Sequence, residues 1–352
     1  MRVLVTGNLG YIGTVMTPML IAAGHEVRGY DCDLYARCTF GPPSAITPVP
    51  TTIKDIRDAV VEDFEGFDAV IHLAGLSNDP LGDFQPELTD EINHRGSVNA
   101  ARLARQAGVK RFLFASSCSN YGAGGSSILE ETGALNPVTP YGRSKVDGEV
   151  GLRGLASGTF TPVFLRPATA FGVSPRLRFD LVINNLVAWA CSTGKIHLKS
   201  DGSPWRPVAH IEDISRAFIA ALEAPRELVH CEAFNVGRTS ENYQVKDLAR
   251  IVGEVVAGCS VELAKGAGPD TRNYRVSFEK IARVLPAFQP RWTARTGAEQ
   301  LRNAFIAEGV TLAEFEGPKY QRIAHIKELI RTGVLTRDLR RTATAEGVAL
   351  AH

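Results

Sequence analysis

The chain has little that would commit it to nucleic acid, to a membrane or to a disulfide-stabilised fold. Its 39 basic and 38 acidic side chains leave a formal net charge of +1, which gives no basic footprint for nucleic acid. The six cysteines show neither paired spacing nor a metal-ligand pattern. The longest apolar run, Leu181 to Cys191, is interrupted by asparagine and is too short to span a bilayer. Because the first expected strand starts at Arg2, no secretory leader is expected, and the sequence predicts a reduced, cytoplasmic protein without a metal site.

A chain of 352 residues with 44% hydrophobic content can bury a large core, and one large domain with a smaller lobe is the expected partition. Strand-like and helix-like stretches alternate through its first half. The expected strands are Arg2–Thr6, Glu26–Tyr30, Ala69–Ala74, Arg111–Ser116 and Pro162–Arg166, and the expected helices are Val15–Ala23, Glu87–Ala107 and Tyr141–Ala156. This alternation predicts an α/β fold with a doubly wound parallel sheet, in which ligands collect at the carboxyl ends of the strands.

A glycine-rich turn joins the first strand to the first helix. Gly7, Gly10 and Gly13 permit a tight bend, close backbone approach to a pyrophosphate, and close packing of the helix on the strand. About twenty residues further on, the second strand ends in Asp31, where a carboxylate accepts hydrogen bonds from an adenosine ribose and repels a 2′-phosphate. The other interpretation of Asp31 is a turn residue, as is expected of Asp33. The pattern favours a dinucleotide site that prefers NAD to NADP.

Tyr141 and Lys145 lie four residues apart at the start of an expected helix, downstream of Ser116-Ser117. This spacing stacks a phenol and an ammonium group on one helix face. A free tyrosine has a pKa of about 10, so a phenolate base near neutral pH costs roughly 4 kcal/mol unless a nearby cation stabilises it. Alone, the spacing is common on solvated helix faces. Beside a nucleotide-binding turn, it instead predicts a catalytic tyrosine assisted by the lysine.

With these residues in place the chain resembles the extended branch of the short-chain dehydrogenase/reductase superfamily, and within it the NAD-dependent epimerase/dehydratase family that acts on nucleotide sugars. The resemblance covers nearly the whole chain, from Thr6-Gly7 to about Ala287. Its motifs occur in order: the glycine turn, Asp55-Ile56-Arg57-Asp58, His72-Leu73-Ala74-Gly75, Asn93, Ser116-Ser117, Tyr121-Gly122, and Tyr141 with Lys145. The resemblance implies NAD as the cofactor and a Rossmann-type domain with a smaller C-terminal substrate lobe. Asn8-Leu9 replaces a smaller pair that is common in the family, which makes the phosphate turn less typical.

The resemblance also implies a role for each motif residue. The implied cofactor contacts are Tyr11 and Ile12 in the phosphate turn, Asp55 or Asp58 with Ile56 at the adenine edge, Leu73, Ala74 and Gly75 beneath the cofactor, and Asn93. Tyr141 and Lys145 are catalytic and also contact the cofactor, since the lysine binds the nicotinamide ribose. Ser117 holds the sugar hydroxyl, with Ser116 as its rival by position.

The second half of the chain supplies the expected substrate contacts. Arg206 matches the family arginine that pairs with the diphosphate of a nucleotide-diphosphate sugar, and Arg272 resembles a second one. A guanidinium group suits phosphate because it is planar, permanently charged and bidentate. Thr169 lies where relatives often carry an asparagine, which leaves the identity of the substrate open. Asn184 is a further candidate contact with the nucleotide.

Three other side chains of this half have two interpretations each. Arg176 and Arg178 either add to the positive field around the diphosphate or are solvated loop charges. His210 precedes Glu212-Asp213 at an expected helix start, where capping and lobe packing are favoured over catalysis.

The implied reaction begins when Tyr141 removes the proton of a sugar hydroxyl, expected on C4, while hydride passes from carbon to the nicotinamide. Return of the hydride to the opposite face makes an epimerase. Elimination of water across C5 and C6 makes a 4,6-dehydratase. An external reduction makes an NAD(P)H-dependent 4-ketoreductase. A catalytically idle NAD-binding scaffold is disfavoured, because both Tyr141 and Lys145 are intact.

The residues after the catalytic serine favour the first outcome. Dehydratase relatives carry an Asp-Glu pair there, and decarboxylases of uronic-acid nucleotides often carry glutamate at the position of Ser119. This chain has Cys118 and Ser119 instead. Cys118 is expected to be a small buried residue beneath the cofactor rather than a thiolate acid or base. The sequence therefore predicts a nucleotide-sugar epimerase.

The expected organisation has three parts. Residues 1–172 form the NAD-binding domain with a return segment at 208–223, residues 173–207 and 224–309 form the substrate lobe, and residues 310–352 form a helical extension. An amphipathic helix is expected over residues 321–335, without a legible purpose. In relatives, the helices equivalent to residues 87–107 and 141–156 meet those of a second copy in a four-helix interface, so a homodimer is expected.

Overall fold

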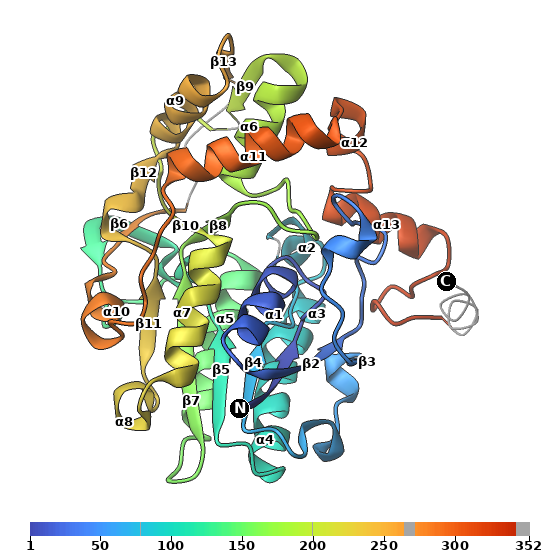
Figure 1. The fold of residues 1–352 in the computed structure, drawn as a ribbon, viewed down its shortest axis with the longest axis vertical. Coiled ribbons are helices and arrows are strands. Elements are labelled where there is room, and N and C mark those ends of the chain that lie inside the picture. The colour runs from blue at the N-terminus through green and yellow to red at the C-terminus, as the bar shows by residue number, and fades with distance from the viewer. Residues whose placement is uncertain (78, 199, 264–271, 343–352) are drawn as a thin grey trace.

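The computed structural model describes residues 1–77, 79–198, 200–263 and 272–342. A seven-stranded parallel sheet forms the centre of the main domain, in the order β11-β7-β5-β4-β1-β2-β3 (Figure 1). Its strands are β1 (Arg2–Thr6), β2 (Glu26–Asp31), β3 (Thr51–Ile53), β4 (Ala69–His72), β5 (Arg111–Ala115), β7 (Thr161–Pro167) and β11 (Ala233–Val236). The strand order reverses direction between β1 and β4, which confirms the doubly wound sheet and puts a ligand crevice at that point.

Helices cover both faces of this sheet, because its strands are apolar on both sides. In β1, Val3 and Val5 pack into one hydrophobic cluster while Leu4 packs into another. The helices α1 (Gly13–Ala22) and α7 (Ile211–Glu223) contact one another on the first face. On the second face α4 (Ser97–Gln106) contacts α5 (Pro140–Arg153).

The helix predicted over residues 87–107 is present but is not uniform. It comprises α3 (Pro86–Thr89), a π-helical segment (Asp90–Gly96) and α4, while the short helix α2 (Asp79–Phe84) precedes it. The predicted helix 141–156 starts at Pro140 and ends at Arg153, three residues early. A π-helical segment is invisible to a pattern search for a 3.6-residue period, because it changes the hydrogen bonding locally without ending the helix.

The smaller lobe lies over the carboxyl ends of the strands, at the top of Figure 1. Its helices are α6 (Val182–Thr193), α9 (Val245–Val255) and α11 (Ala294–Glu308), and its strands are β8 (Thr169–Phe171), β9 (Lys195–Leu198), β10 (Trp205–His210), β12 (Asn242–Gln244), β13 (Ser260–Leu263) and β14 (Asn273–Val276). β14 pairs with β6 (Ala123–Leu129), and the short helices α8 (Arg226–Val229) and α10 (Glu279–Val284) complete this half of the chain.

One predicted boundary is wrong. The return segment was expected to end at residue 223, with the lobe starting at 224, but β11 pairs in parallel with β7 and belongs to the main sheet. The main domain therefore continues to about Val236. The short strand Ala233–Val236 escapes prediction because four apolar residues can equally belong to a buried helix or loop.

The C-terminal extension packs onto both parts of the molecule: its first helix contacts α6 of the lobe, and the rest packs onto the main domain. It contains α12 (Leu312–Glu316) and α13 (Arg322–Arg331), so the predicted amphipathic helix is present but shorter. Its buried residues Ile326, Leu329, Leu335 and Leu339 join the hydrophobic cluster beneath β2 and α4. None of the helices in the described ranges is long and apolar enough to cross a membrane.

Candidate active site

A cavity of about 910 Å³ opens where the lobe meets the carboxyl ends of the central strands. It collects residues from the whole length of the chain. Of the residues predicted for the site, those that line it are Gly7, Gly10, Tyr11, Ile12, Gly13, Asp31, Asp55, Ile56, Leu73, Ala74, Gly75, Ser117, Tyr141, Lys145, Thr169, Arg206 and Arg272. Asn93, Asn184 and Asp58, the alternative to Asp55, are missing from its wall.

The glycine turn between β1 and α1 has no room for side chains. Gly7 has a φ of +77°, and a Cβ atom added there would lie 2.7 Å from the backbone nitrogen of Ala74. A Cβ on Gly13 would lie 2.3 Å from the carbonyl oxygen of Gly7. The bare turn and the N-terminus of α1 therefore form a cradle of backbone N–H groups, which fits a pyrophosphate.

Asn8, the atypical residue of this turn, is accommodated by a second glycine. Its side chain is buried and donates from Nδ2 to Thr51 Oγ1 at 3.1 Å. A Cβ on Gly29 would lie 2.3 Å from that same Nδ2 atom. The missing side chain at Gly29 thus makes the space that Asn8 fills, and the departure leaves the phosphate turn intact.

Asp31 ends β2 at the wall of the cavity. One carboxylate oxygen accepts from the backbone N–H of Leu9 at 2.9 Å and the other from that of Asp33 at 2.8 Å. Burial raises the pKa of Asp31, and these two backbone bonds oppose that rise. Each oxygen keeps a lone pair, so the carboxylate can accept from ribose hydroxyl groups while it ties the glycine turn to the strand.

The structure separates the two candidates for the adenine edge. Asp55 lines the cavity, whereas Asp58 does not and instead pairs with Arg340. The Asp55 carboxylate accepts from Arg57 Nε at 3.0 Å and Nη2 at 2.7 Å. Burial opposes ionisation of Asp55, but the bonds from Arg57 outweigh it and lower its pKa.

Tyr141 and Lys145 lie on the first turns of α5, at the cavity wall. Thr139 caps this helix by accepting from the backbone N–H of Gly142 at 3.1 Å, and Pro140 occupies its first position. The Nζ atom of Lys145 is 5.8 Å from the centroid of the Tyr141 ring and 4.8 Å from that of Phe114. Burial lowers the pKa of Lys145 to about 8, so its proton is held less firmly than in water.

The two serines before the tyrosine have different surroundings. Ser116 Oγ is buried and donates to Glu149 Oε1 at 2.5 Å. Ser117 Oγ caps the following turn by accepting from the N–H of Ser119 at 3.1 Å, and the residue is only half-buried. Ser117 is thus the serine with a hydroxyl available to a bound sugar, in line with the motif.

Cys118 is fully buried, and its thiol donates to the carbonyl oxygen of Arg166 at 3.1 Å. Burial strongly raises its pKa, so the thiolate does not form near neutral pH. Ser119 lines the cavity, as does Tyr274 from the lobe. Neither position after Ser117 offers a carboxylic acid.

Arg206 and Arg272 of the lobe line the cavity, as does Arg178. Arg206 in β10 is buried, donates to its neighbour Trp205 O at 2.8 Å and also donates to the carbonyl oxygen of Arg272. Its Cζ atom is 5.9 Å from the ring centroid of Tyr274. Both arginines line the cavity opposite the residues of the main domain, together with Thr169.

Asn184 does not face the cavity. Its Oδ1 accepts from the N–H of Gly172 at 3.0 Å, and its Nδ2 donates to Arg178 O at 2.9 Å and to the Tyr11 hydroxyl at 3.3 Å. The side-chain amide of Asn184 therefore makes its hydrogen bonds within the protein, where it fixes the crossover into the lobe. Its neighbour Asn185 lines the cavity instead, because adjacent residues of a helix project about 100° apart.

Asn93 also supports the site from behind. Its Oδ1 accepts from Leu76 N at 2.7 Å, and its Nδ2 donates to Leu76 O at 2.9 Å and to Ser144 Oγ at 3.3 Å. These bonds tie the loop after β4 to α5. Asn93 thus positions Gly75 and Lys145 rather than lining the cavity itself.

The solvated interpretation of Arg176 and Arg178 is wrong, since both are buried. Arg178 lines the cavity and makes a bidentate pair with Asp180, at 2.6 and 3.1 Å. His210, as expected, caps α7 by accepting from Glu212 N at 3.2 Å. The burial of both arginines follows from contacts with distant segments, which a local pattern does not contain.

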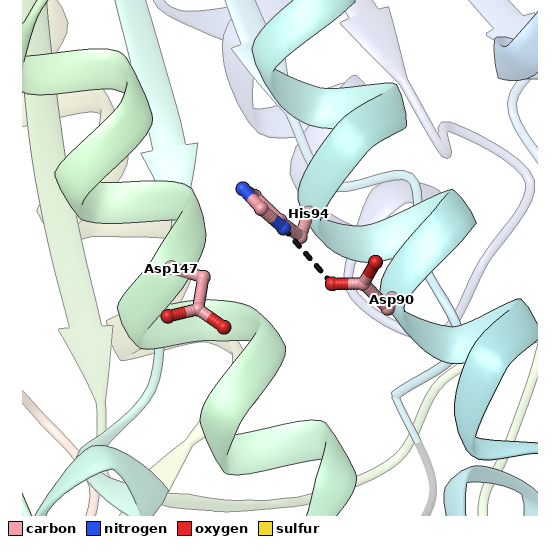
Figure 2. Close-up of side chains that lie close together, drawn as sticks. All are labelled: Asp90, His94 and Asp147. Carbon is pink, nitrogen blue, oxygen red and sulfur yellow. Dashed lines mark hydrogen bonds and ion pairs between the residues drawn. The ribbon is translucent and has the colours of Figure 1, made fainter.

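Figure 2 shows a cluster outside the cavity, in which Asp90, His94 and Asp147 bring ligand atoms within 4.8 Å of one another. His94 Nδ1 lies 2.9 Å from one oxygen of Asp90, and Arg95 Nε donates to the other at 2.9 Å. Both oxygens of Asp90 thus already have partners within the protein. The cluster carries no metal assignment.

The fold and the cavity define a dinucleotide-binding α/β protein with a serine, a tyrosine and a lysine beside the nucleotide cradle. The profile of the NAD dependent epimerase/dehydratase family matches residues 3–237, and its end coincides with the end of β11. The chain belongs to this family. NAD is accordingly the cofactor that the cradle serves.

Individual relatives agree with this assignment. UDP-glucose 4-epimerase of Azospirillum brasilense is 30% identical over 292 residues, which cover 76% of this chain and 82% of that protein. UDP-glucose 4-epimerase of Bacillus subtilis (strain 168) is 28% identical over 332 residues, covering 86% and 94%.

Solved structures show the same fold. UDP-glucose 4-epimerase of Thermus thermophilus in complex with NAD superposes with a TM-score of 0.73 at 24% identity, over 87% of this chain and 99% of that one. TunA, an NAD-dependent NDP-hexosamine 5,6-dehydratase, superposes with a TM-score of 0.76 at 22% identity, over 87% and 98%. The fold is therefore shared by epimerases and dehydratases and does not separate them.

Proposed function

We propose that the protein is a nucleotide-sugar epimerase that acts through transient oxidation at C4 of the sugar. The observation that carries the proposal is the composition of the cavity wall. Tyr141, Lys145 and Ser117 line it beside the glycine turn, while Arg206 and Arg272 line it from the lobe. A proton acceptor and two phosphate-binding groups thus face the same space as the cofactor cradle.

Each side chain of the main domain has a defined task in this reaction. Bound NAD supplies a reversible hydride acceptor. Tyr141, as phenolate, accepts the proton of the C4 hydroxyl, and the nearby ammonium of Lys145 stabilises the phenolate. Ser117 donates a hydrogen bond to the substrate oxygen and holds it against the tyrosine. The result is a 4-keto sugar that regains hydride on either face.

The lobe arginines bind the other end of the substrate in this proposal. Arg206 and Arg272 pair with the diphosphate, which leaves the sugar free to turn its other face to the nicotinamide. Arg206 is held by Trp205 O and by Arg272 O, so its guanidinium is oriented before the substrate arrives. Such preorganisation limits the entropy lost on binding.

Two observations favour epimerisation over elimination. Elimination needs an acid and a base near C5 and C6, and the positions after Ser117 hold Cys118 and Ser119. Cys118 is fully buried with a strongly raised pKa, so it does not replace the missing carboxyl group. The curated relatives that the chain matches at 28 to 30% identity are UDP-glucose 4-epimerases, which support the same outcome.

The test is to incubate the purified protein, without added cofactor, with UDP-, dTDP-, GDP- and CDP-sugars in deuterated water. We expect one pair of C4 epimers to interconvert without deuterium entering the sugar. Tyr141→Phe should lower turnover at least about 100-fold, because it removes the proton acceptor. Tyr243→Phe, which removes a phenol hydroxyl outside the cavity wall, should leave turnover nearly unchanged.

Two results would reject the proposal. Deuterium at C5 with loss of water would identify a dehydratase. A requirement for added NADH or NADPH, with a reduced sugar as the only product, would identify a ketoreductase.

A further inference from the structure

Three buried arginines, Arg176, Arg178 and Arg322, gather behind the glycine turn, and one of them has a buried N–H group without an acceptor. Arg176 pairs with Asp33 at 3.2 Å and Arg178 with Asp180 at 2.6 Å. Within the described ranges Arg322 makes no ion pair, and its Nε has no hydrogen-bond partner. The Tyr35 ring and the more distant Asp180 carboxylate offset part of its charge, but the buried Nε–H is left without an acceptor. A buried donor without a partner is expensive, so its retention points to a negative group that binds there.

Arg322 arrives from the C-terminal extension, yet it lines the cofactor cavity. Its Nη2 donates to Arg176 O at 3.3 Å, and its Cζ lies 3.9 Å from the ring centroid of Tyr35. Arg176 in turn donates from Nε to Leu9 O, inside the glycine turn, at 3.2 Å. The Arg322 guanidinium is therefore one contact removed from the backbone that cradles the pyrophosphate.

The rest of the extension is fastened to the same rim of the cavity. Arg341 Nη2 donates to Cys32 O at 3.1 Å and to Asp33 O at 3.0 Å, while His325 Nε2 lies 3.1 Å from Leu34 O. Further along the rim, Arg57 Nη2 donates to Asp338 O at 2.9 Å. Gln321, Ile323 and Leu339 line the cavity beside Arg322. The extension thus forms a wall over the loop that follows Asp31.

We propose that Arg322 binds the pyrophosphate of NAD, so that the C-terminal extension completes the cofactor site. The glycine turn offers N–H groups and the N-terminal dipole of α1, and Arg322 adds the full positive charge that this turn lacks. A guanidinium group suits the task because it donates to two phosphate oxygens at once. The inference rests on NAD as the cofactor and is independent of the sugar chemistry proposed above.

The test compares full-length Arg322→Gln with Arg331→Gln, which removes an exposed arginine of the same helix that pairs with Glu328. Binding of NADH is followed by fluorescence, and ADP, adenosine and UDP are used as competitors. In Arg322→Gln the dissociation constants of NADH and ADP should rise between about tenfold and 100-fold, the loss expected for a charged hydrogen bond. The constant for adenosine should change less than twofold, and Arg331→Gln should match the wild type.

Each other outcome overturns the proposal. Unchanged NADH and ADP binding would show that Arg322 does not contact the cofactor phosphates. An equal loss of affinity for adenosine and ADP would show that Arg322 supports the adenosine site without contacting the phosphates. A loss confined to UDP would assign the guanidinium to the substrate diphosphate. Arg322→Lys keeps the charge but loses the bidentate donor geometry, so it should bind NADH with intermediate strength. This variant replaces Arg322→Gln in the test if the glutamine variant does not fold.

Discussion

At the residue scale the chemistry depends on a lysine that is easier to deprotonate than usual. Lys145 is buried against the ring of Phe114, and its near neighbour His72 is locked between Thr6 and Ser97. Burial and the charge of Lys145 lower the pKa of His72 to about 3, so the imidazole stays neutral. Lys145 is therefore a titrating cation beside Tyr141, whereas Arg178, which also interacts with Tyr141, keeps its charge.

We expect turnover to fall as pH rises through about 8, the pKa to which burial lowers Lys145. Below that pH the ammonium stabilises the Tyr141 phenolate, and above it the neutral amine does not. The measurement is the maximal rate at saturating substrate from pH 6 to 10. The Lys145→Met variant should have a low maximal rate at every pH and should not show this fall in rate at alkaline pH. A wild-type rate that keeps rising to pH 10 would contradict the role given to the ammonium.

Much of the site could be predicted at this scale, because its motifs depend on local geometry. The glycine turn, Asp31 and the Tyr141–Lys145 pair follow from strand–turn–helix geometry and from the helix period. The choices between Asn184 and Asn185, and between Asp55 and Asp58, do not. In each case two similar side chains lie close together in sequence, and only tertiary contacts decide which one reaches the cavity.

At the scale of elements, a buried ion pair joins α5 to the strands that carry the serine. Glu149 accepts from Arg166 Nε at 2.8 Å and Nη2 at 2.6 Å, and it also accepts from Ser116 Oγ and from Asn120 Nδ2. This network fixes the turn containing Ser117 against the helix that carries Tyr141. The sequence did not reveal it, because a glutamate in a helix is ordinarily solvated.

Glu149→Gln should lower the free energy of unfolding by about 3 kcal/mol or more, because it leaves the charge of Arg166 buried without its partner. Urea unfolding measures this loss. Glu254→Gln removes an exposed carboxylate that pairs with Arg250 and Arg295 and should change the midpoint little. Equal midpoints for the two variants would show that the buried pair is not a significant source of stability.

Element boundaries were less predictable than element types. The strands and helices of the first half lie where the apolar pattern placed them, because the buried residues of each element repeat with a single regular period. The π-helical segment Asp90–Gly96 and the short strand β11 were not foreseen. Their formation depends on contacts with α5 and β7, which lie far away in the sequence.

At the scale of the whole molecule, the two long helices of the second face remain candidates for a homodimer interface. Of their apolar residues, Ile92, Leu103 and Leu152 are buried in the core of the protein. Val150 on α5 is 66% exposed. The helix pair thus divides its apolar side chains between the sheet and the outer face, which supports a dimer through that face.

We expect light scattering at micromolar concentration to give about twice the chain mass of 38.0 kDa. Val150→Asp should shift the protein toward the monomer, because it places a charge within the proposed interface. Ile306→Asp, at a residue of the lobe that is 67% exposed, is the matched control and should leave the mass unchanged. If the wild-type protein were monomeric and fully active, the proposed dimer would be rejected.

Epimerisation by the proposed route requires that hydride leaves C4 of the sugar and returns to the same carbon. The most direct measurement uses the best substrate of the nucleotide-sugar series with deuterium at C4, incubated in ordinary water without added cofactor. We predict that the C4-inverted product keeps its deuterium at C4, as seen by NMR and mass spectrometry. Loss of the label to solvent, or its transfer to C6 with loss of water, would contradict epimerisation by hydride return.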